Sequence, residues 1–337
     1  MADPRAALWA VLLAAGCAGL CALLILILKP LLVRHLLAHP NARSSHTIPT
    51  PQGAGLAVMF SVLAGSALAL LVGAPEVEPS LLPVLVIAAA LTLLGALDDA
   101  RTLPVSWRLI GQALAGAALV LSLPEDFRLF PDLMPLGIER AVLAFGTVWF
   151  INAVNFLDGL DWMTVVQVVP ITFGVAILHG LGAVPATIGV LALALLGATL
   201  GFAIFNKHPA QIFLGDAGSL PIGLCLAFLL IFVAKAHLAA ALLFCLYTMA
   251  DSTLTLFRRF LAKEGILSAH RTHFYQRGVA AGLSVTQVTA RVLRLQVLLV
   301  VLGIVTVLAR SAAVDRVCLG LGILSTLLVL YALAKGR

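Results

Sequence analysis

Long apolar segments alternate with short polar ones along almost the whole chain. Because the apolar runs are continuous, helices are expected rather than the alternating strands of a membrane barrel. Several runs are shorter than the roughly 20 residues that usually cross a bilayer, so ten spans is the alternative to eleven. The pattern predicts an all-α, polytopic helix bundle that forms one domain over residues 1–337. The eleven expected spans lie at about residues 7–28, 53–74, 81–97, 105–123, 140–156, 164–180, 184–205, 219–235, 237–257, 292–309 and 316–334.

The composition agrees with a membrane protein. Hydrophobic residues make up 62% of the 337, charged residues 11%, and the mean hydropathy is +1.11. Soluble domains hold about 25% charged residues, so this chain lacks the side chains that a water-facing surface needs. The first apolar run is longer than a signal-peptide core and is expected to stay as an anchor. All five cysteines lie in apolar runs without a Cys-x-x-Cys pair, which argues against disulfides and a zinc site.

The basic residues are distributed unevenly between the two sets of loops. Loops after odd-numbered spans, together with the C-terminus, hold 15 of the 21 Lys and Arg residues. The positive-inside rule therefore predicts that this side is cytoplasmic. The net charge of +6 is spread over short loops, and no helix-turn-helix or finger pattern occurs, so no nucleic acid partner is expected. Five unusually polar breaks lie on the same side, which makes it the expected location of a site.

The break at residues 206–219 is the most suggestive of the five. It holds one carboxylate, Asp216, between Gly215 and Gly218. Glycines let a backbone approach a ligand closely, and an acid beside basic residues suits a divalent cation that holds a phosphate. An ordinary loop with Ser219 as the cap of the next helix is the alternative.

Adjacent carboxylates, Asp98 and Asp99, end the third apolar run. Each would cost about 2.5–3.5 kcal/mol at the bilayer centre, so they must reach the interface, a cation or a polar cavity. Adjacent acids raise each other's pKa unless a metal or an arginine offsets them. One of them could then act as a base or bind a metal. A pair of interfacial acids is the alternative interpretation.

Amides and acids gather at the end of the fifth run. On a helix, Asn152, Asn155 and Asp158 would repeat every three residues and share one face, with Asp161 close behind. Hydrogen bonding between helices explains Asn152 but explains the two acids poorly.

Two further breaks contain histidine and arginine. Residues 43–55 offer His46, an arginine and hydroxyls between prolines and glycines, which would form a phosphate cradle or a plain connector. The break at residues 270–277 begins with His270, Arg271 and His273, a set that suits a diphosphate. A basic patch that touches anionic lipid is the alternative for this second break. Together, the breaks hold acids for a metal and bases for phosphates, which is what phosphoryl transfer requires.

Several of these motifs occur in an order that is similar to a known family. They are Pro49-Thr50-Pro51 with the glycines after it, Asp98-Asp99, Asn-Ala-Val-Asn-x-x-Asp-Gly-Leu-Asp from Asn152, Phe-x-Gly-Asp-x-Gly-Ser from Phe213, and a histidine loop before the last spans. Over roughly residues 40–280 the chain resembles the polyprenyl-phosphate N-acetylhexosamine-1-phosphate transferases, a family that includes the phospho-N-acetylmuramoyl-pentapeptide transferase. The resemblance implies a bacterial inner-membrane enzyme with a cytoplasmic site. Such enzymes transfer a sugar 1-phosphate from a UDP-sugar to undecaprenyl phosphate and release UMP.

The resemblance also implies roles for residues of this chain. Asp216 would bind Mg²⁺, with Mn²⁺ as an alternative ion and Asp98 as a second candidate ligand. The implied catalytic residues are Asp98, Asp99, Asp158 and Asp216. The implied substrate-binding residues are His46, Arg108, Asn152, Asn155, Gly159, Leu160, Asp161, Asn206, Phe213, His270, Arg271 and His273. A homodimer is compatible with the sequence.

One departure bears on the pathway. The dense histidine triplet of the peptidoglycan enzyme is replaced by His-Arg-Thr-His-Phe-Tyr-Gln-Arg from His270, which is more similar to the branch that initiates O-antigen or other surface glycans. Trp162 also stands where many relatives have glycine. Peptidoglycan synthesis is the nearer alternative, and a secondary transporter of an anionic solute is the alternative from a different class. A transporter would place its acids near the middle of the membrane and contain inverted repeats, whereas here the acids gather on one side.

Overall fold

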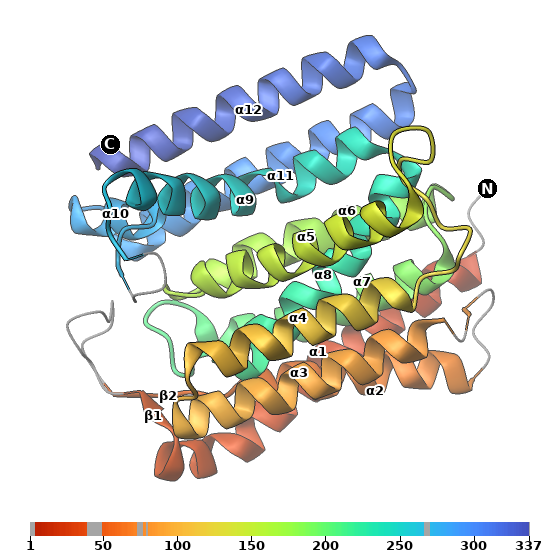
Figure 1. The fold of residues 1–337 in the computed structure, drawn as a ribbon. Coiled ribbons are helices and arrows are strands. Elements are labelled where there is room, and N and C mark those ends of the chain that lie inside the picture. The colour runs from red at the N-terminus through yellow and green to blue at the C-terminus, as the bar shows by residue number, and fades with distance from the viewer. Residues whose placement is uncertain (1–3, 39–48, 73–76, 79, 266–269, 337) are drawn as a thin grey trace.

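A computed structural model describes residues 4–38, 49–72, 77–78, 80–265 and 270–336 (Figure 1). Within these residues the chain is almost entirely helical, with one pair of two-residue strands. The long helices are α1 (Pro4–His35), α2 (Gly55–Leu71), α3 (Leu81–Arg101), α4 (Val105–Leu121), α5 (Leu136–Phe156), α6 (Met163–Gly180), α7 (Ala186–Asn206), α8 (Asp216–Ala236), α9 (Leu238–Leu261), α11 (Val285–Ala309) and α12 (Ala312–Lys335). The short elements are β1 (Leu37–Ala38), β2 (Thr50–Pro51) and α10 (Phe274–Ala280).

The eleven long helices correspond to the eleven predicted segments. In the described part of the chain, nine are long and apolar enough to cross a membrane, and α2 and α4 are shorter apolar helices. The predicted start at residue 292 was wrong for α11, which begins at Val285. The Ser284 hydroxyl accepts a hydrogen bond from the Gln287 main-chain N–H at 3.1 Å, and the Gln287 side chain accepts one from the Ser284 N–H at 2.9 Å. This capping box adds two polar turns that hydropathy does not count as a span.

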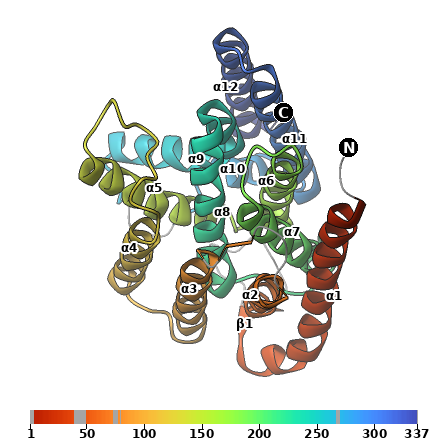
Figure 2. The same cartoon turned by 90° about the vertical axis from the view of Figure 1, so that its right-hand side faces the viewer.

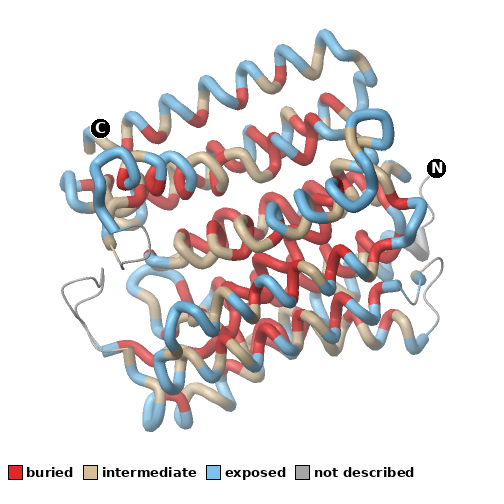
Figure 3. Tube along the Cα trace, in the orientation of Figure 1, coloured by how far each residue is buried: buried red, intermediate tan, exposed pale blue. Residues whose placement is uncertain are grey.

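Helix α8 lies at the centre of the bundle. Seen along the helices, α8 is surrounded by neighbours, and α1 and α12 lie at the rim (Figure 2). Most of α8 is buried, whereas α1 and α12 are mostly exposed (Figure 3). Close contact depends on small residues, because a Cβ at Gly95 of α3 would collide with the main chain of Asp216 and Ala217. The core therefore holds the first turn of α8 directly against α3.

The outer surface of the bundle is apolar. On α12, the side chains of Val317, Leu321, Leu324 and Leu328 are all about half exposed or more. An apolar exterior of this extent is rare on soluble proteins, but it suits contact with lipid. The protein is a multi-pass membrane protein.

The predicted polar breaks gather at one end of the bundle. Strands β1 and β2 form an antiparallel pair with Leu37 opposite Pro51 and Ala38 opposite Thr50. Gln52, just after β2, forms a bridge to Phe213 in the loop before α8. In Figure 1 the strands, α10 and the C-terminus lie at the left end, and the N-terminus lies at the right. The described parts of these breaks therefore lie at one end of the bundle, as the sequence predicted.

Candidate active site

Asp99 joins the end of α3 to the start of α8. Its Oδ1 accepts hydrogen bonds from the Gln52 side chain at 2.6 Å and the Asp216 main-chain N–H at 2.9 Å, and its Oδ2 accepts one from the Ala217 N–H at 3.1 Å. These two main-chain N–H groups lie at the N-terminus of α8 and have no acceptor within the helix, so a negative charge is favoured there. Gly215 has φ +78°, and a Cβ there would press on the Asp99 carboxylate. Glycine is therefore needed for the acid to reach the helix end.

Asp98 and Asp216 both contact one arginine, Arg108. The Arg108 Nη1 lies 3.0 Å from an oxygen of Asp98 and 3.1 Å from an oxygen of Asp216. Asp98 also accepts a hydrogen bond from the Leu103 N–H at 2.6 Å, just past the end of α3. All three side chains are partly exposed. The Arg108 guanidinium therefore joins the two carboxylates, and all three groups stay within reach of solvent and ligands.

Asn155 completes the surroundings of Asp216. Its amide nitrogen donates to the second oxygen of Asp216 at 2.9 Å and to the Ser219 hydroxyl oxygen at 2.8 Å. Asn152 instead donates to Gln112 of α4 and to the Val148 carbonyl. Of the two amides, Asn155 is therefore the one that the structure places beside the acids, and Asn152 joins α5 to α4.

The expected shared face of Asn152, Asn155 and Asp158 was wrong in one respect, because α5 ends at Phe156. Asp158 lies in the following turn and accepts a hydrogen bond from the Thr164 hydroxyl at the start of α6. Burial raises the pKa of Asp158 to about 8, and the negative charges of Asp216 and Asp99 add to the shift. Near neutral pH this carboxyl group is therefore largely uncharged.

The segment after Asp158 is held against the loop that follows α7. Asp161 accepts hydrogen bonds from His208 Nδ1 at 2.6 Å and the Ala210 N–H at 3.0 Å. Trp162 adopts φ +64°, which is rare for a bulky side chain. Its N–H donates to the Asn206 side chain at 2.7 Å, and its indole N–H donates to the Ala203 carbonyl at 2.8 Å. These bonds fix the backbone in this conformation.

Four further predicted residues are placed by main-chain contacts, by packing or, for Asn206, by a side-chain hydrogen bond. The Phe213 carbonyl accepts from the N–H groups of Gly53 and Ala54 at 3.1 and 3.0 Å, so the glycine loop before α2 lies against the Asp216 loop. Leu160 is buried. The Asn206 side-chain nitrogen donates a hydrogen bond to the Ile212 carbonyl at 2.9 Å. Gly159 is exposed and lies against the Tyr275 hydroxyl.

A buried acid, Asp251 of α9, positions α10. It is fully inaccessible to solvent, and it accepts hydrogen bonds from the main-chain N–H groups of Phe274 and Tyr275 at 2.9 and 3.2 Å. Its Oδ1 also lies 3.3 Å from His273 Nδ1. The Tyr275 hydroxyl in turn donates to the Phe156 carbonyl at 2.9 Å. This chain of contacts joins α9, α10 and the turn that holds Asp158.

The histidine loop differs from a simple cluster of positive charges. The rings of His270 and His273 stack with centroids 5.0 Å apart. Burial lowers the pKa of His270 to about 4, and the nearby charges of His273, Arg259 and Arg258 act in the same direction. His270 is therefore neutral near pH 7 and offers a ring N–H rather than a charge. Arg271 is exposed beside it, and His46 lies outside the described residues.

Comparison with known proteins identifies the relatives of this chain. The profile of glycosyl transferase family 4 matches residues 81–234, which run from α3 to near the end of α8. A probable undecaprenyl-phosphate N-acetylglucosaminyl 1-phosphate transferase of Bacillus subtilis is 31% identical over 259 residues, which cover 73% of this chain and 70% of the relative. The chain belongs to glycosyl transferase family 4. Within it, the chain falls among the polyprenyl-phosphate N-acetylhexosamine-1-phosphate transferases, as its motifs predicted.

Two other members of the family match over a shorter range. The decaprenyl-phosphate N-acetylglucosaminephosphotransferase of Mycobacterium leprae is 35% identical over 211 residues, 56% of this chain and 52% of that protein. The phospho-N-acetylmuramoyl-pentapeptide-transferase of a Synechococcus strain is 31% identical over 209 residues, 56% of this chain and 55% of that protein. The matched part thus spans about half the length of these two relatives.

The donor set of this family 4 site fits a hard divalent cation. Among the described residues no group of three or more His, Cys, Asp and Glu side chains could enclose a metal. Mg²⁺ does not need such an enclosure, because it usually keeps several waters and binds through one or two carboxylates and substrate phosphates. Asp98 and Asp216 provide two carboxylates that already contact one cationic group, Arg108. The residues therefore fit the ion.

Sequence reasoning missed several residues that form the site. Gln52, Thr164 and Tyr275 contact Asp99, Asp158 and the Phe156 carbonyl. Gln52 and Tyr275 lie within two of the predicted breaks, but nothing in the sequence assigned either of them a role. Asp251 did carry a signal, because a lone carboxylate within an apolar run is costly to bury without partners. That cost predicts that Asp251 has hydrogen-bond partners, but it does not identify them.

Proposed function

We propose that this family 4 member transfers N-acetylhexosamine 1-phosphate from a UDP-sugar to undecaprenyl phosphate, with release of UMP. The observation that supports this most is the junction of Asp98, Arg108 and Asp216, which offers positive and negative groups to two phosphorylated reactants at one end of an apolar bundle. The names of the relatives describe transfer of N-acetylglucosamine phosphate to undecaprenyl or decaprenyl phosphate.

In the proposed reaction, an oxygen of the lipid phosphate attacks the β-phosphorus of the UDP-sugar. The bond from this phosphorus to the bridging oxygen breaks as the new phosphorus–oxygen bond forms, and UMP leaves with that oxygen. Asp99 is fixed by the N–H groups of Asp216 and Ala217, which makes it a poor nucleophile. Asp98 is held by the Leu103 N–H and by Arg108. These bonds favour direct attack by the lipid over an aspartyl intermediate.

The other groups act by position and charge. Arg108 attracts the anionic reactants, and the Asn155 amide fixes the direction of the Asp216 carboxylate. Asp216 and Asp98 would hold Mg²⁺, or Mn²⁺ in its place, and the bound ion would neutralise charge on the diphosphate. Neutral His270 and the exposed Arg271 would contact the diphosphate as hydrogen-bond donors.

The setting of the reaction is also part of the proposal. We expect the chain in a bacterial inner membrane with this site in the cytoplasm, where it would start an O-antigen-like surface glycan. The absence of a dense histidine triplet from the loop at His270–Arg277 is the reason to prefer this pathway to peptidoglycan synthesis. The use of a UDP-sugar as the donor and the formation of a homodimer stay predictions.

Purified protein in detergent with undecaprenyl phosphate, Mg²⁺ and a panel of UDP-N-acetylhexosamines tests the reaction through UMP release. One donor should give UMP and a lipid-linked sugar phosphate. Asp216→Ala should lower the rate at least about a hundredfold, the usual cost of losing a charge-stabilising group. Lys207→Ala, at an exposed position nearby, is the matched control and should be active. Retained activity in the Asp216 variant would remove that residue from the proposal. Counterflow of a solute in proteoliposomes, without UMP release, would instead indicate a transporter.

A further inference from the structure

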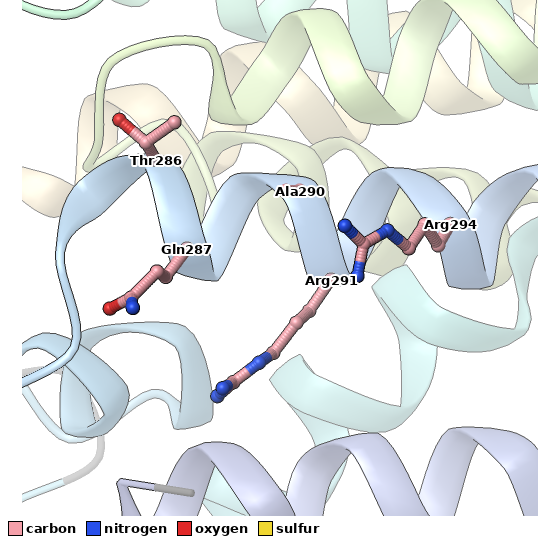
Figure 4. A pocket seen from close by; sticks show the side chains of 5 residues that line it. All are labelled: Thr286, Gln287, Ala290, Arg291 and Arg294. Carbon is pink, nitrogen blue, oxygen red and sulfur yellow. The ribbon is translucent and has the colours of Figure 1, made fainter.

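A small cavity lies on α11, away from the carboxylates of the site. It has a volume of about 260 Å³ and is lined by Thr286, Gln287, Ala290, Arg291 and Arg294 (Figure 4). These positions share one face of the first turns of α11. Figure 4 shows both arginine side chains extending from this face. The cavity therefore presents two cations and two neutral polar groups at the end of the bundle where α10 lies.

Among the residues that the structure describes, neither arginine of this cavity has an acidic partner. The Arg291 Nη1 atom is buried and has no hydrogen-bond partner within the described structure. None of the five lining residues is acidic. From residue 265 to the C-terminus the sequence has a single acid, Asp315. It pairs with His237 near the start of α12, at the end of the bundle opposite to this cavity (Figure 1). A buried cationic nitrogen without an acceptor is costly, so an anion from outside the chain would stabilise it.

The position of the arginines along α11 indicates where that anion comes from. Arg291 and Arg294 lie six and nine residues after Val285, which corresponds to roughly 9 and 13 Å along the helix axis. Thr286 and Gln287 in the first turn are polar and exposed, as expected for a helix that begins in water. A helix that begins in water would place residues at these two distances near the lipid headgroups, where phosphate groups are available.

An apolar stripe continues from the arginines toward the middle of α11. Leu298, Val301 and Val305 follow Arg294 at four, seven and eleven residues, so they share its face of the helix. All three side chains are exposed, at 40%, 50% and 39%. A ligand with a negative headgroup and an acyl chain matches both parts of this surface.

We propose that this cavity and stripe bind an anionic phospholipid, with its phosphate at Arg291 and Arg294 and an acyl chain along Leu298, Val301 and Val305. An undecaprenyl phosphate has similar chemistry, but the reacting acids are on α3 and α8, whereas α11 packs on α6, α9 and α12. A lipid held here would not present its phosphate to Asp98 or Asp216. The site is thus one for a structural lipid, and it does not depend on the proposed reaction.

Native mass spectrometry of the purified protein tests the proposal. The protein is incubated with phosphatidylglycerol, phosphatidylcholine or undecaprenyl phosphate, and the retained lipid is counted. Phosphatidylglycerol should be retained in preference to phosphatidylcholine, and Arg291→Gln with Arg294→Gln should weaken its binding about thirtyfold. Arg316→Gln changes an exposed arginine near the start of α12 and should bind as the unaltered protein does.

A single variant and two competing ligands distinguish a structural lipid from a substrate lipid or a free anion. Arg294→Gln alone alters an exposed side chain, so the effect can be measured even if the double variant fails to fold. Equal retention of phosphatidylglycerol by this variant and the unaltered protein would overturn the proposal. So would a preference for undecaprenyl phosphate that the double variant loses, because the cavity would then serve the substrate. Full displacement of the lipid by inorganic phosphate would also overturn it, because the acyl chain would then add nothing.

Discussion

The two adjacent acids at the end of α3 have different surroundings. Asp99 accepts two main-chain hydrogen bonds at the start of α8, and Asp98 contacts Arg108 and remains beside Asp216. The family resemblance implied a catalytic role for both. A sequence does not show which of two neighbouring carboxylates caps a distant helix, because that depends on the close packing at Gly95 and Gly215. Asp98 is therefore the one of the pair that is better placed to contact substrate.

The carboxyl group of Asp158 leads to a pH prediction. Burial raises its pKa to about 8, so it is mostly neutral below that pH and becomes an anion above it. The new charge would lie near Asp216 and Asp99, where an anionic diphosphate is proposed to bind. The KM for the UDP-sugar should therefore rise as the pH increases from about 7 to about 9. Asp158→Asn imitates the neutral form and should have a KM that stays nearly constant over the same range.

Steady-state UMP release at each pH measures this effect. The Lys207→Ala variant should follow the unaltered protein, since its position is exposed and outside the carboxylate cluster. An identical rise in KM for Asp158→Asn would assign the effect to another group. A KM that falls above pH 8 in the unaltered protein would show that the ionised carboxylate assists binding.

At the scale of elements, apolar periodicity located the helices but not all of their ends. Residues 81 and 105 were predicted correctly as the starts of α3 and α4. The polar first turns of α11 were missed because Arg291 and Gln287 interrupt the apolar run. The short helix α10 was not predicted, because its seven residues are held by contacts with Asp251 that come from another part of the chain. Local sequence cannot encode such an element on its own.

The attachment of α10 to α9 is open to test through Asp251. Asp251→Asn replaces one acceptor oxygen with an NH₂ group, which would face main-chain N–H donors of Phe274 or Tyr275. Leaving such a buried donor unpaired costs about 1–3 kcal/mol. The variant should melt at a lower temperature, and the displaced histidine loop should raise the KM for the UDP-sugar.

Asp315→Asn provides the control for this change. Asp315 also pairs with a histidine, His237, but it lies at the opposite end of the bundle. The Asp315→Asn variant should leave the KM for the UDP-sugar unchanged. Tyr275→Phe removes only the hydrogen bond to the Phe156 carbonyl and should give a smaller effect, about 1 kcal/mol in stability. If Asp251→Asn had the melting temperature and KM of the unaltered protein, the role of Asp251 in holding α10 would be refuted.

At the scale of the whole molecule, the bundle brings together groups that are far apart in sequence. Asp99 and the start of α8 are in direct contact although more than one hundred residues separate them. The sequence predicted that these breaks share one side, because the number of spans between them fixes the side of each loop. Their mutual distances could not be predicted, because loop position depends on how the helices pack around α8.

The side of the membrane on which this end lies gives the last prediction. The excess of Lys and Arg in these loops predicts that it is cytoplasmic. In intact cells, a membrane-impermeant maleimide should therefore fail to label Lys207→Cys, at the site end, and should label Arg316→Cys, at the opposite end. Both introduced thiols are at exposed positions, whereas four native cysteines are buried and Cys245 is partly buried. After the cells are permeabilised, both variants should label equally. Labelling of Lys207→Cys in intact cells would place the carboxylates outside, where the UDP-sugar pool of the cytoplasm could not reach them, and the proposed reaction would then be excluded.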